Sequence, residues 1–183
     1  MSAAPTLRVA TLADVPALQA LIAASARGLA AGDYSAAQIE AALGTAWGVD
    51  SELIRDGTYF VVEADGEAIA CGGWSRRATL FGADAQPGRE SALLDPARDA
   101  ARVRAFFVHP DWARRGIGRL LLAHCEAAAS AHGFRHAELM ATLPGVRLYR
   151  ACGYAGDART THALPGGLRI EFVPMRKRLA AEN

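Results

Sequence analysis

The sequence has little cysteine, no long apolar run and almost no net charge, and each absence excludes a class of protein. The three cysteines of the 183-residue chain, Cys71, Cys125 and Cys152, are too few and too scattered for a disulfide framework or a zinc site. No apolar run approaches the roughly 20 residues that span a bilayer. A formal net charge of +1 gives no overall field that attracts nucleic acid or anionic lipid. We therefore expect no metal, nucleic-acid or membrane partner.

The amino terminus lacks the basic start and apolar segment of an export signal, so we expect a cytoplasmic protein. The content of 51% hydrophobic and 21% charged residues is typical of a soluble globular protein rather than a disordered one. We see no repeat, low-complexity segment or linker. The length suits one domain with a sizeable core, which predicts a single domain over residues 1–183.

Capping and periodicity predict the elements of the first third of the chain. A short strand is expected over residues 7–10, and Thr11 with Asp14 forms a capping box at the start of a helix. Ser35 with Gln38 marks a second helix start, and residues 51–55 predict one further helical turn. Two strand-like runs, 59–64 and 68–74, then flank Asp65-Gly66, which is a strong hairpin signal.

A polar stretch over residues 75–100 predicts a long loop with one turn of helix at most. Loops of this length are uncommon without a function, but a mobile insertion without a role fits equally well. Beyond it, the pattern predicts a strand over 101–108, a helix over 116–131, a strand over 136–141, a short helix over 146–152, a strand from Tyr154 onward and a last strand over 168–175. The order is β-α-α-β-β-β-α-β-α-β-β, which indicates an α/β fold.

The segment between the fourth predicted strand and its helix carries the clearest chemical signal. A helix amino terminus offers unpaired N–H groups and a partial positive charge, both of which favour phosphate. Glycines allow a close backbone approach, and arginines add forked donors. The residues concerned are Arg114, Arg115, Gly116, Ile117, Gly118 and Arg119. They indicate an anion site, although a tight turn with solvated arginines fits equally well. The segment lacks the Gly-Lys-Ser/Thr of a P-loop and the third glycine of a Rossmann motif.

Residues 109–122, His-Pro-Asp-Trp-Ala-Arg-Arg-Gly-Ile-Gly-Arg-Leu-Leu-Leu, resemble the acetyl-CoA motif of the GNAT (GCN5-related N-acetyltransferase) family. Residues 148–154, Leu-Tyr-Arg-Ala-Cys-Gly-Tyr, resemble a second motif of that family, after its fifth strand. The order of elements is similar over nearly the whole chain. The resemblance implies the GNAT fold, a mixed, twisted central sheet of about six to seven strands with helices on both faces.

The resemblance also implies roles for particular residues. Backbone amides from Arg114 to Arg119 would bind the pyrophosphate of acetyl-CoA, the co-substrate. The pantetheine arm would pair with the exposed edge of the fourth strand at Phe106, Phe107 and Val108. Tyr149 would be the catalytic general acid that gives a proton to the leaving thiolate. A tyrosine on a short amphipathic helix can equally be a core residue with its hydroxyl at the rim.

Two positions depart from the family pattern. Ala113 stands where Gln or Arg is frequent, which moves the expected phosphate contacts to the backbone. Thr142 stands where an asparagine often precedes the tyrosine, and the role of that asparagine does not carry over to threonine.

The attacking amine must lose a proton, but the sequence identifies no base with certainty. Glu138 is one candidate, although strand alternation could equally turn its side chain outward. His109 is another, although His109-Pro110 could simply cap the end of the preceding strand. Trp74, Arg76 and Arg77 could line an acceptor pocket or belong to a solvated loop. His124 and Cys152 are expected to be packing residues.

We therefore expect an acetyl-CoA-dependent N-acetyltransferase acting on a primary amine of an unidentified, small-molecule acceptor. Transfer to a protein or peptide and a non-catalytic acyl-CoA-binding regulatory module are the alternatives. A homodimer is common in the family.

Overall fold

The computed structural model describes residues 4–89 and 91–180. Residues 1–3 and 181–183, the two ends of the predicted 1–183 domain, lie outside the described residues, and so does the start of the amino-terminal segment that we interpreted above. Seven strands form one sheet in the order β1-β2-β3-β4-β5-β7-β6. Their bounds are Thr6–Val9 (β1), Tyr59–Ala64 (β2), Glu67–Ser75 (β3), Ala101–Val108 (β4), His136–Thr142 (β5), Thr160–Ala163 (β6) and Arg169–Arg178 (β7).

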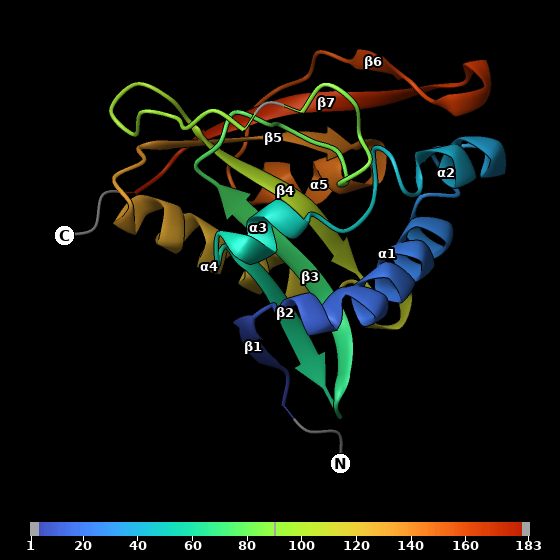
Figure 1. The fold of residues 1–183 in the computed structure, drawn as a ribbon, viewed down its shortest axis with the longest axis horizontal. Helices are drawn as coiled ribbons and strands as arrows, with labels where there is room; N and C mark the ends of the chain where they lie inside the picture. Colours follow the sequence, from blue (N-terminus) through green and yellow to red (C-terminus); the bar gives the residue numbers. More distant parts are fainter. Residues whose placement is uncertain (1–3, 90, 181–183) are drawn as a thin grey trace.

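Helices cover both faces of the sheet, as predicted (Figure 1). They are α1 (Val15–Leu29), α2 (Ala36–Ala42), α3 (Ser51–Arg55), α4 (Ile117–Ala131) and α5 (Val146–Ala151). Short 3-10 turns are η1 (Leu12–Asp14), η2 (Pro110–Trp112), η3 (Leu143–Gly145) and η4 (Pro165–Gly167). The alternation of side chains along the strands supplies two cores. One core packs under α4 and α5, and the other under α1, α2 and α3.

Most local signals in the sequence are confirmed. The capping box of Ser35 and Gln38 forms reciprocally, with the Ser35 N–H donating to the Gln38 side chain at 2.8 Å. The hairpin between β2 and β3 turns at Asp65 and Gly66, with φ values of 51° and 81°. Both residues have left-handed φ values, which matches the right-handed twist of the flanking strands.

One expectation is corrected. The strand predicted from Tyr154 onward begins only at Thr160, and Ala155 makes a single bridge to Arg176. The reason lies at Gly156, where φ is 152° and a Cβ would lie 2.1 Å from the Pro174 carbonyl oxygen, so the chain passes too close to β7 for regular pairing. The long segment between β3 and β4 is a loop, as predicted, and its described residues, 76–89 and 91–100, include a hydrogen-bonded turn in which the Asp99 N–H donates to the Asp95 carbonyl at 2.7 Å.

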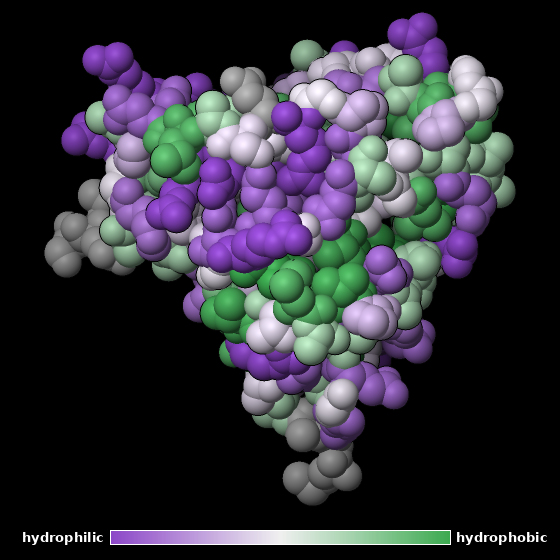
Figure 2. All heavy atoms as spheres, viewed as in Figure 1, coloured by the Kyte–Doolittle hydropathy of each residue, from purple (hydrophilic) through white to green (hydrophobic). Residues whose placement is uncertain are grey.

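Surface composition adds one observation. On the face shown in Figure 2, an apolar area is bordered by hydrophilic side chains. No helix in the two described ranges is long and apolar enough to cross a membrane.

Candidate functional site

The two central parallel strands separate soon after they begin. β4 and β5 pair only at Ala101 with Ala137 and at Arg102 with Glu138, at the start of each strand. Past those pairs β5 continues to pair with β7, while β4 stays with β3. The rest of β4 therefore faces a gap in the sheet rather than a neighbouring strand. Residues 106–108, predicted from the family resemblance to be an exposed edge, lie along this gap.

A β-bulge redirects β4 as it enters the gap. Cys71 is paired with Phe107 and Gly73 with Arg104, so that two residues of β4 oppose Gly72 alone. The extra residue, Ala105, has a φ of 57°, a left-handed value that is unfavourable for a residue with a Cβ. A Cβ at position 72 would lie 2.4 Å from the Phe106 ring. Glycine is therefore required for the ring to lie where it does.

The backbone of β4 offers donors to the gap. The His109 N–H pairs with the Ile69 carbonyl of β3 at 2.8 Å, so alternation directs the N–H groups of Val108 and Phe106 to the other edge. There the Val108 N–H donates to the Ser25 hydroxyl of α1 at 3.3 Å. Ser25 is buried, and the sequence analysis missed it. A serine on the otherwise apolar face of a predicted helix was the available signal.

The amino terminus of α4 lies beside the same gap. Gly116 precedes the helix with a φ of 85°, and no side chain caps its first turn. A Cβ at Gly116 would meet nothing within 4 Å, so the space above the first N–H groups is open. At Gly118, by contrast, a Cβ would lie 3.0 Å from Leu148, so this glycine allows close packing on α5. An uncapped helix terminus of this kind favours an anion.

These features form the wall of one pocket of about 700 Å³. Of the residues predicted to bind the co-substrate, its wall includes Phe106, Phe107, Val108, Arg114, Gly116, Gly118 and Arg119. Arg115 instead lies over the Trp112 ring at 5.0 Å, and the Ile117 side chain is buried in the core. Ala113 and Thr142, the two departures from the family pattern, are wall residues, as are Ser25, Trp47, Trp112 and Arg147, which the sequence analysis did not select.

Tyr149 of α5 lies in the wall of this pocket and also of a second, smaller cavity. Its ring packs edge-on to Phe106 and to Tyr154, with ring centroids 6.5 and 5.9 Å apart. Burial raises the pKa of the Tyr149 hydroxyl, so the side chain stays protonated across the physiological range. Tyr149 thus lies, in its protonated form, in the walls of both cavities.

A buried tyrosine positions the turn that precedes α5. The Tyr34 hydroxyl donates to the Glu171 carbonyl at 2.7 Å and accepts from the Leu143 N–H at 2.9 Å. Burial raises the pKa of Tyr34 to about 12. This pair of bonds joins the end of β5 to β7 and fixes where α5, and with it Tyr149, begins.

The candidate bases lie away from the two cavities. Glu138 forms an ion pair with Arg102 at the closed end of the gap, where β4 and β5 are still paired. The His109 ring accepts the Asp111 N–H at 3.3 Å as the cap of η2, which agrees with the capping alternative. Neither residue belongs to a cavity wall.

The other residues considered from the sequence have structural surroundings. Trp74 is buried under His132 and Phe134, so it does not line an acceptor pocket. Arg77 forms a bidentate pair with Asp56, at 2.7 and 2.9 Å. Three further residues lie outside both cavity walls: Arg76, His124 and Cys152. In the described part of the chain, no group of three His, Cys, Asp or Glu side chains could hold a metal ion.

The smaller cavity, of about 60 Å³, shares Trp47, Phe106, Phe107, Thr142 and Tyr149 with the larger pocket. Its remaining wall comes from β4, β5, β7, the segment between α2 and α3, and the long segment before β4. The two cavities thus meet at the gap between β4 and β5, one at the uncapped helix and one under the long segment.

An open α/β sheet with a divided central parallel pair and a helix amino terminus beside the gap defines a class of acyltransferase folds. The sequence profile of the family described as "acetyltransferase (GNAT) domain" matches residues 55–155, more than half of the chain. The protein belongs to the GNAT acetyltransferase family.

Solved structures share the fold. A GCN5-related N-acetyltransferase (aminotransferase, class-II) of Rhodopseudomonas palustris is 22% identical, with a TM-score of 0.71 over 98% of each chain. The PaiA N-acetyltransferase of Thermoplasma acidophilum, in complex with coenzyme A, is 14% identical, with a TM-score of 0.64 over 96% of this chain and 99% of that one. YncA of Salmonella typhimurium, with acetyl-CoA, is 17% identical, with a TM-score of 0.62 over 99% of this chain and 97% of that one. No curated protein matches the chain significantly.

Proposed function

We propose that the protein is one GNAT domain that transfers an acetyl group from acetyl-CoA to the nitrogen of a primary amine on a small molecule. The observation that carries the proposal is the convergence, in one pocket, of the bare edge of β4 and the uncapped amino terminus of α4. An extended arm that ends in phosphates matches both features: the amide groups of the arm pair with a strand edge, and the phosphates bind a helix terminus.

Several of the chain's own groups would hold acetyl-CoA. The first-turn N–H groups from Gly116 to Arg119 would bind the pyrophosphate, and the Arg114 and Arg119 side chains in the same wall would add positive charge. The edge of β4 at Phe106 and Val108 offers N–H groups to the pantetheine arm. One of these N–H groups, near the thioester carbonyl, would stabilise the charge that develops on its oxygen.

When bound, acetyl-CoA supplies an acetyl group activated as a thioester. A bond forms between the amine nitrogen and the acetyl carbon, the carbon–sulfur bond breaks, and the nitrogen loses a proton while the sulfur gains one. Tyr149 would donate that proton, a role that its place in the walls of both cavities supports. Its raised pKa has a consequence: with an ordinary thiol near about 8.5, complete transfer from the tyrosine alone is uphill. The hydroxyl would therefore donate a hydrogen bond first, and transfer would be coupled to loss of the proton from the nitrogen.

The proposal is tested by measuring acetyl-CoA binding by calorimetry and thiol release with a panel of amines, amino acids, polyamines and peptides. We expect micromolar binding and turnover with at least one small amine. Turnover with peptides alone would favour the protein-acetylating alternative. Tight binding without turnover of any acceptor would favour a regulatory module, and absence of acetyl-CoA binding would overturn the proposal.

A further inference from the structure

The smaller cavity has a lining that selects among amines. Its side chains are mostly aromatic and aliphatic: Trp47, Leu80, Phe81, Phe106, Phe107, Met140 and Phe172. No Asp or Glu is among the described residues of its wall, and the one charged residue there, Arg104, is a cation. The wall therefore offers apolar contact and no counter-charge for an ammonium group.

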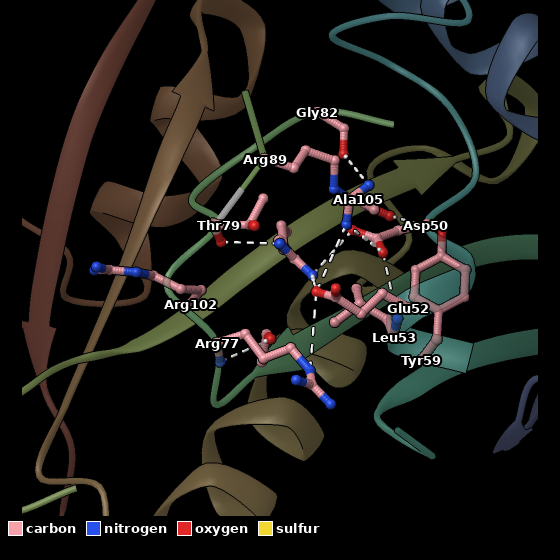
Figure 3. Close-up of polar contacts among 12 residues, drawn as sticks. Asp50, Glu52, Leu53, Tyr59, Arg77, Thr79, Gly82, Arg89, Arg102 and Ala105 are labelled. Carbon is pink, nitrogen blue, oxygen red and sulfur yellow. Dashed lines mark hydrogen bonds and ion pairs between the residues drawn. The ribbon is translucent and has the colours of Figure 1, made fainter. Parts of the chain in front are cut away.

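The Arg104 guanidinium is already bonded to other groups of the protein. Its guanidinium donates to the Thr79 carbonyl at 2.9 Å and lies 3.2 Å from both Asp50 and Glu52. Both carboxylates are thereby paired with Arg104 (Figure 3), and neither is among the residues of the cavity wall. Because both carboxylates already pair with Arg104, neither is available to form an ion pair with a second ammonium group on the acceptor.

The same ion-pair cluster holds the long segment over the cavity. The Arg89 side chain donates to Asp50 at 2.9 Å and to the Gly82 carbonyl at 3.3 Å (Figure 3). The Ala83 N–H donates to the Thr45 carbonyl at 2.6 Å. These bonds place Leu80, Phe81 and Gly82 as a wall, with Phe81 packed on Phe172 at 5.4 Å between ring centroids. The segment between β3 and β4 therefore encloses the cavity.

The volume limits the size of the acceptor. A water molecule needs about 10–15 Å³ in this measure, so about 60 Å³ accommodates roughly four to six non-hydrogen atoms. That matches a short branched alkyl chain or one ring, and it is too small for an extended polyamine or a stretch of polypeptide.

On the basis of the proposed function, we infer that the acceptor is a small primary amine without a second positive charge, whose apolar body, such as the isopentyl group of isopentylamine or the phenyl ring of benzylamine, fills the cavity. The attraction of a cation to aromatic faces is weaker than the cost of dehydrating an unpaired ammonium group, so the wall disfavours a second positive charge. The same surroundings lower the pKa of the reacting amine and favour the uncharged form that attacks. This accounts for a cavity without a carboxylate or histidine base among its described wall residues.

The test compares kcat/KM for isopentylamine and benzylamine with that for spermidine and for a lysine-containing peptide. We expect the apolar amines to exceed both cationic acceptors by at least about tenfold, the equivalent of 1.4 kcal/mol. A preference for spermidine or the peptide would overturn this inference and leave acetyl transfer itself intact. Absence of acetyl-CoA binding would overturn the proposed function as well.

A carboxylate placed in the wall provides a second test. In Phe81→Asp we expect the ratio of spermidine to benzylamine turnover to rise at least about tenfold, since the new charge pairs with a second ammonium. Phe81→Asn has nearly the same shape without the charge and should leave the ratio low. Leu93→Asp adds the same charge to an exposed position of the same segment and should also leave it unchanged. An equal ratio in the Asp and Asn variants of Phe81 would show that the cavity does not receive the acceptor.

Discussion

The buried Tyr59 hydroxyl donates a hydrogen bond to the carbonyl of Ala105 at 3.0 Å, which fixes the residue that bulges out of β4. Ala105 has a left-handed φ of 57°, and this conformation costs an alanine about 1–2 kcal/mol. A net hydrogen bond of about 1 kcal/mol offsets much of that cost. Tyr59 of β2 therefore stabilises the β4 backbone at the point where the larger pocket and the smaller cavity meet.

The bulge leads to a prediction for Gly72, which lies opposite it. In Gly72→Ala the new Cβ would lie 2.4 Å from the Phe106 ring, which must move. Because misplacement by about 1 Å costs about a hundredfold in rate, we expect kcat/KM to fall by at least tenfold while the protein remains folded. Gly32→Ala, where a Cβ meets nothing within 4 Å, is the control. Unchanged turnover in the Gly72 variant would contradict a role for Phe106 in the site.

The open space above Gly116 leads to a matched pair of variants. Gly116→Ala and Gly57→Ala both place an alanine at positive φ, 85° and 71°, with no neighbour within 4 Å. We expect each to lower the free energy of unfolding by about 1–2 kcal/mol. Only Gly116→Ala should weaken acetyl-CoA binding in calorimetry, by about tenfold, because only there does the methyl group lie over the proposed pyrophosphate donors. Equal affinities in the two variants would place the phosphates elsewhere.

Ser25 gives a prediction in which stability and affinity change in opposite directions. Ser25→Ala removes the acceptor of the Val108 N–H, so the ligand-free protein should lose about 1 kcal/mol of stability. If the pantetheine arm takes over that N–H, the bound state loses nothing, and acetyl-CoA should bind up to about fivefold more tightly. Ser130→Ala removes a serine hydroxyl on α4 that bonds the Ala180 carbonyl and should leave affinity unchanged. Weaker binding in Ser25→Ala would mean that the hydroxyl itself contacts the ligand.

Tyr149 is tested by removing its hydroxyl alone. In Tyr149→Phe we expect kcat to fall by about a hundredfold, within the range for loss of a general acid, with acetyl-CoA affinity nearly unchanged. Tyr154→Phe removes a hydroxyl from the neighbouring ring, which lies outside both cavity walls, and should retain kcat. Similar rates for the two variants would remove Tyr149 from the reaction.

The anchoring of the long segment predicts a pH dependence of stability. The hydrogen bonds from Arg77 lower the pKa of Asp56 below its ordinary value, so this pair stabilises the fold fully above about pH 3.9, the value for an unfolded aspartate. The contribution disappears as pH falls from there through the lower pKa of the folded state. Asp56→Asn should therefore cost about 1 kcal/mol in chemical denaturation at pH 7, and the difference from the wild type should shrink below about pH 4. Asp157→Asn breaks a more exposed pair with Arg150 and should cost nothing measurable.

Local signals predicted most of the fold because they are properties of short segments. Capping residues such as Ser35, the Asp65-Gly66 hairpin and the glycine-containing start of α4 determine their own backbone geometry. The prediction of a strand from Tyr154 was wrong because regular pairing there is prevented by the close approach of Gly156 to Pro174. Pro174 belongs to β7, a later segment of the chain, so the local sequence around Tyr154 does not show this contact.

The residues around the acceptor cavity could not be predicted for a related reason. Phe81, Arg104 and Phe172 come from three distant segments, and nothing in their own neighbourhoods indicates that they meet. Ala105 carries no sign of its left-handed conformation, since that conformation depends on Tyr59. Trp74 lies near the end of β3, just before the long segment, yet side-chain alternation directs it into the core under α4.

The divided pair of β4 and β5 has a further consequence, for the association of the protein with itself. An unpaired strand edge normally invites a strand from another chain and is a hazard for aggregation. Here the bare edge lies in the interior of the sheet, between β5 and the Ser25 face of α1, rather than at an outer edge that another chain could extend. A thin, flexible molecule that brings its own amide groups can align along this inner edge. The fold thus keeps open backbone donors available without placing them at an outer edge of the sheet.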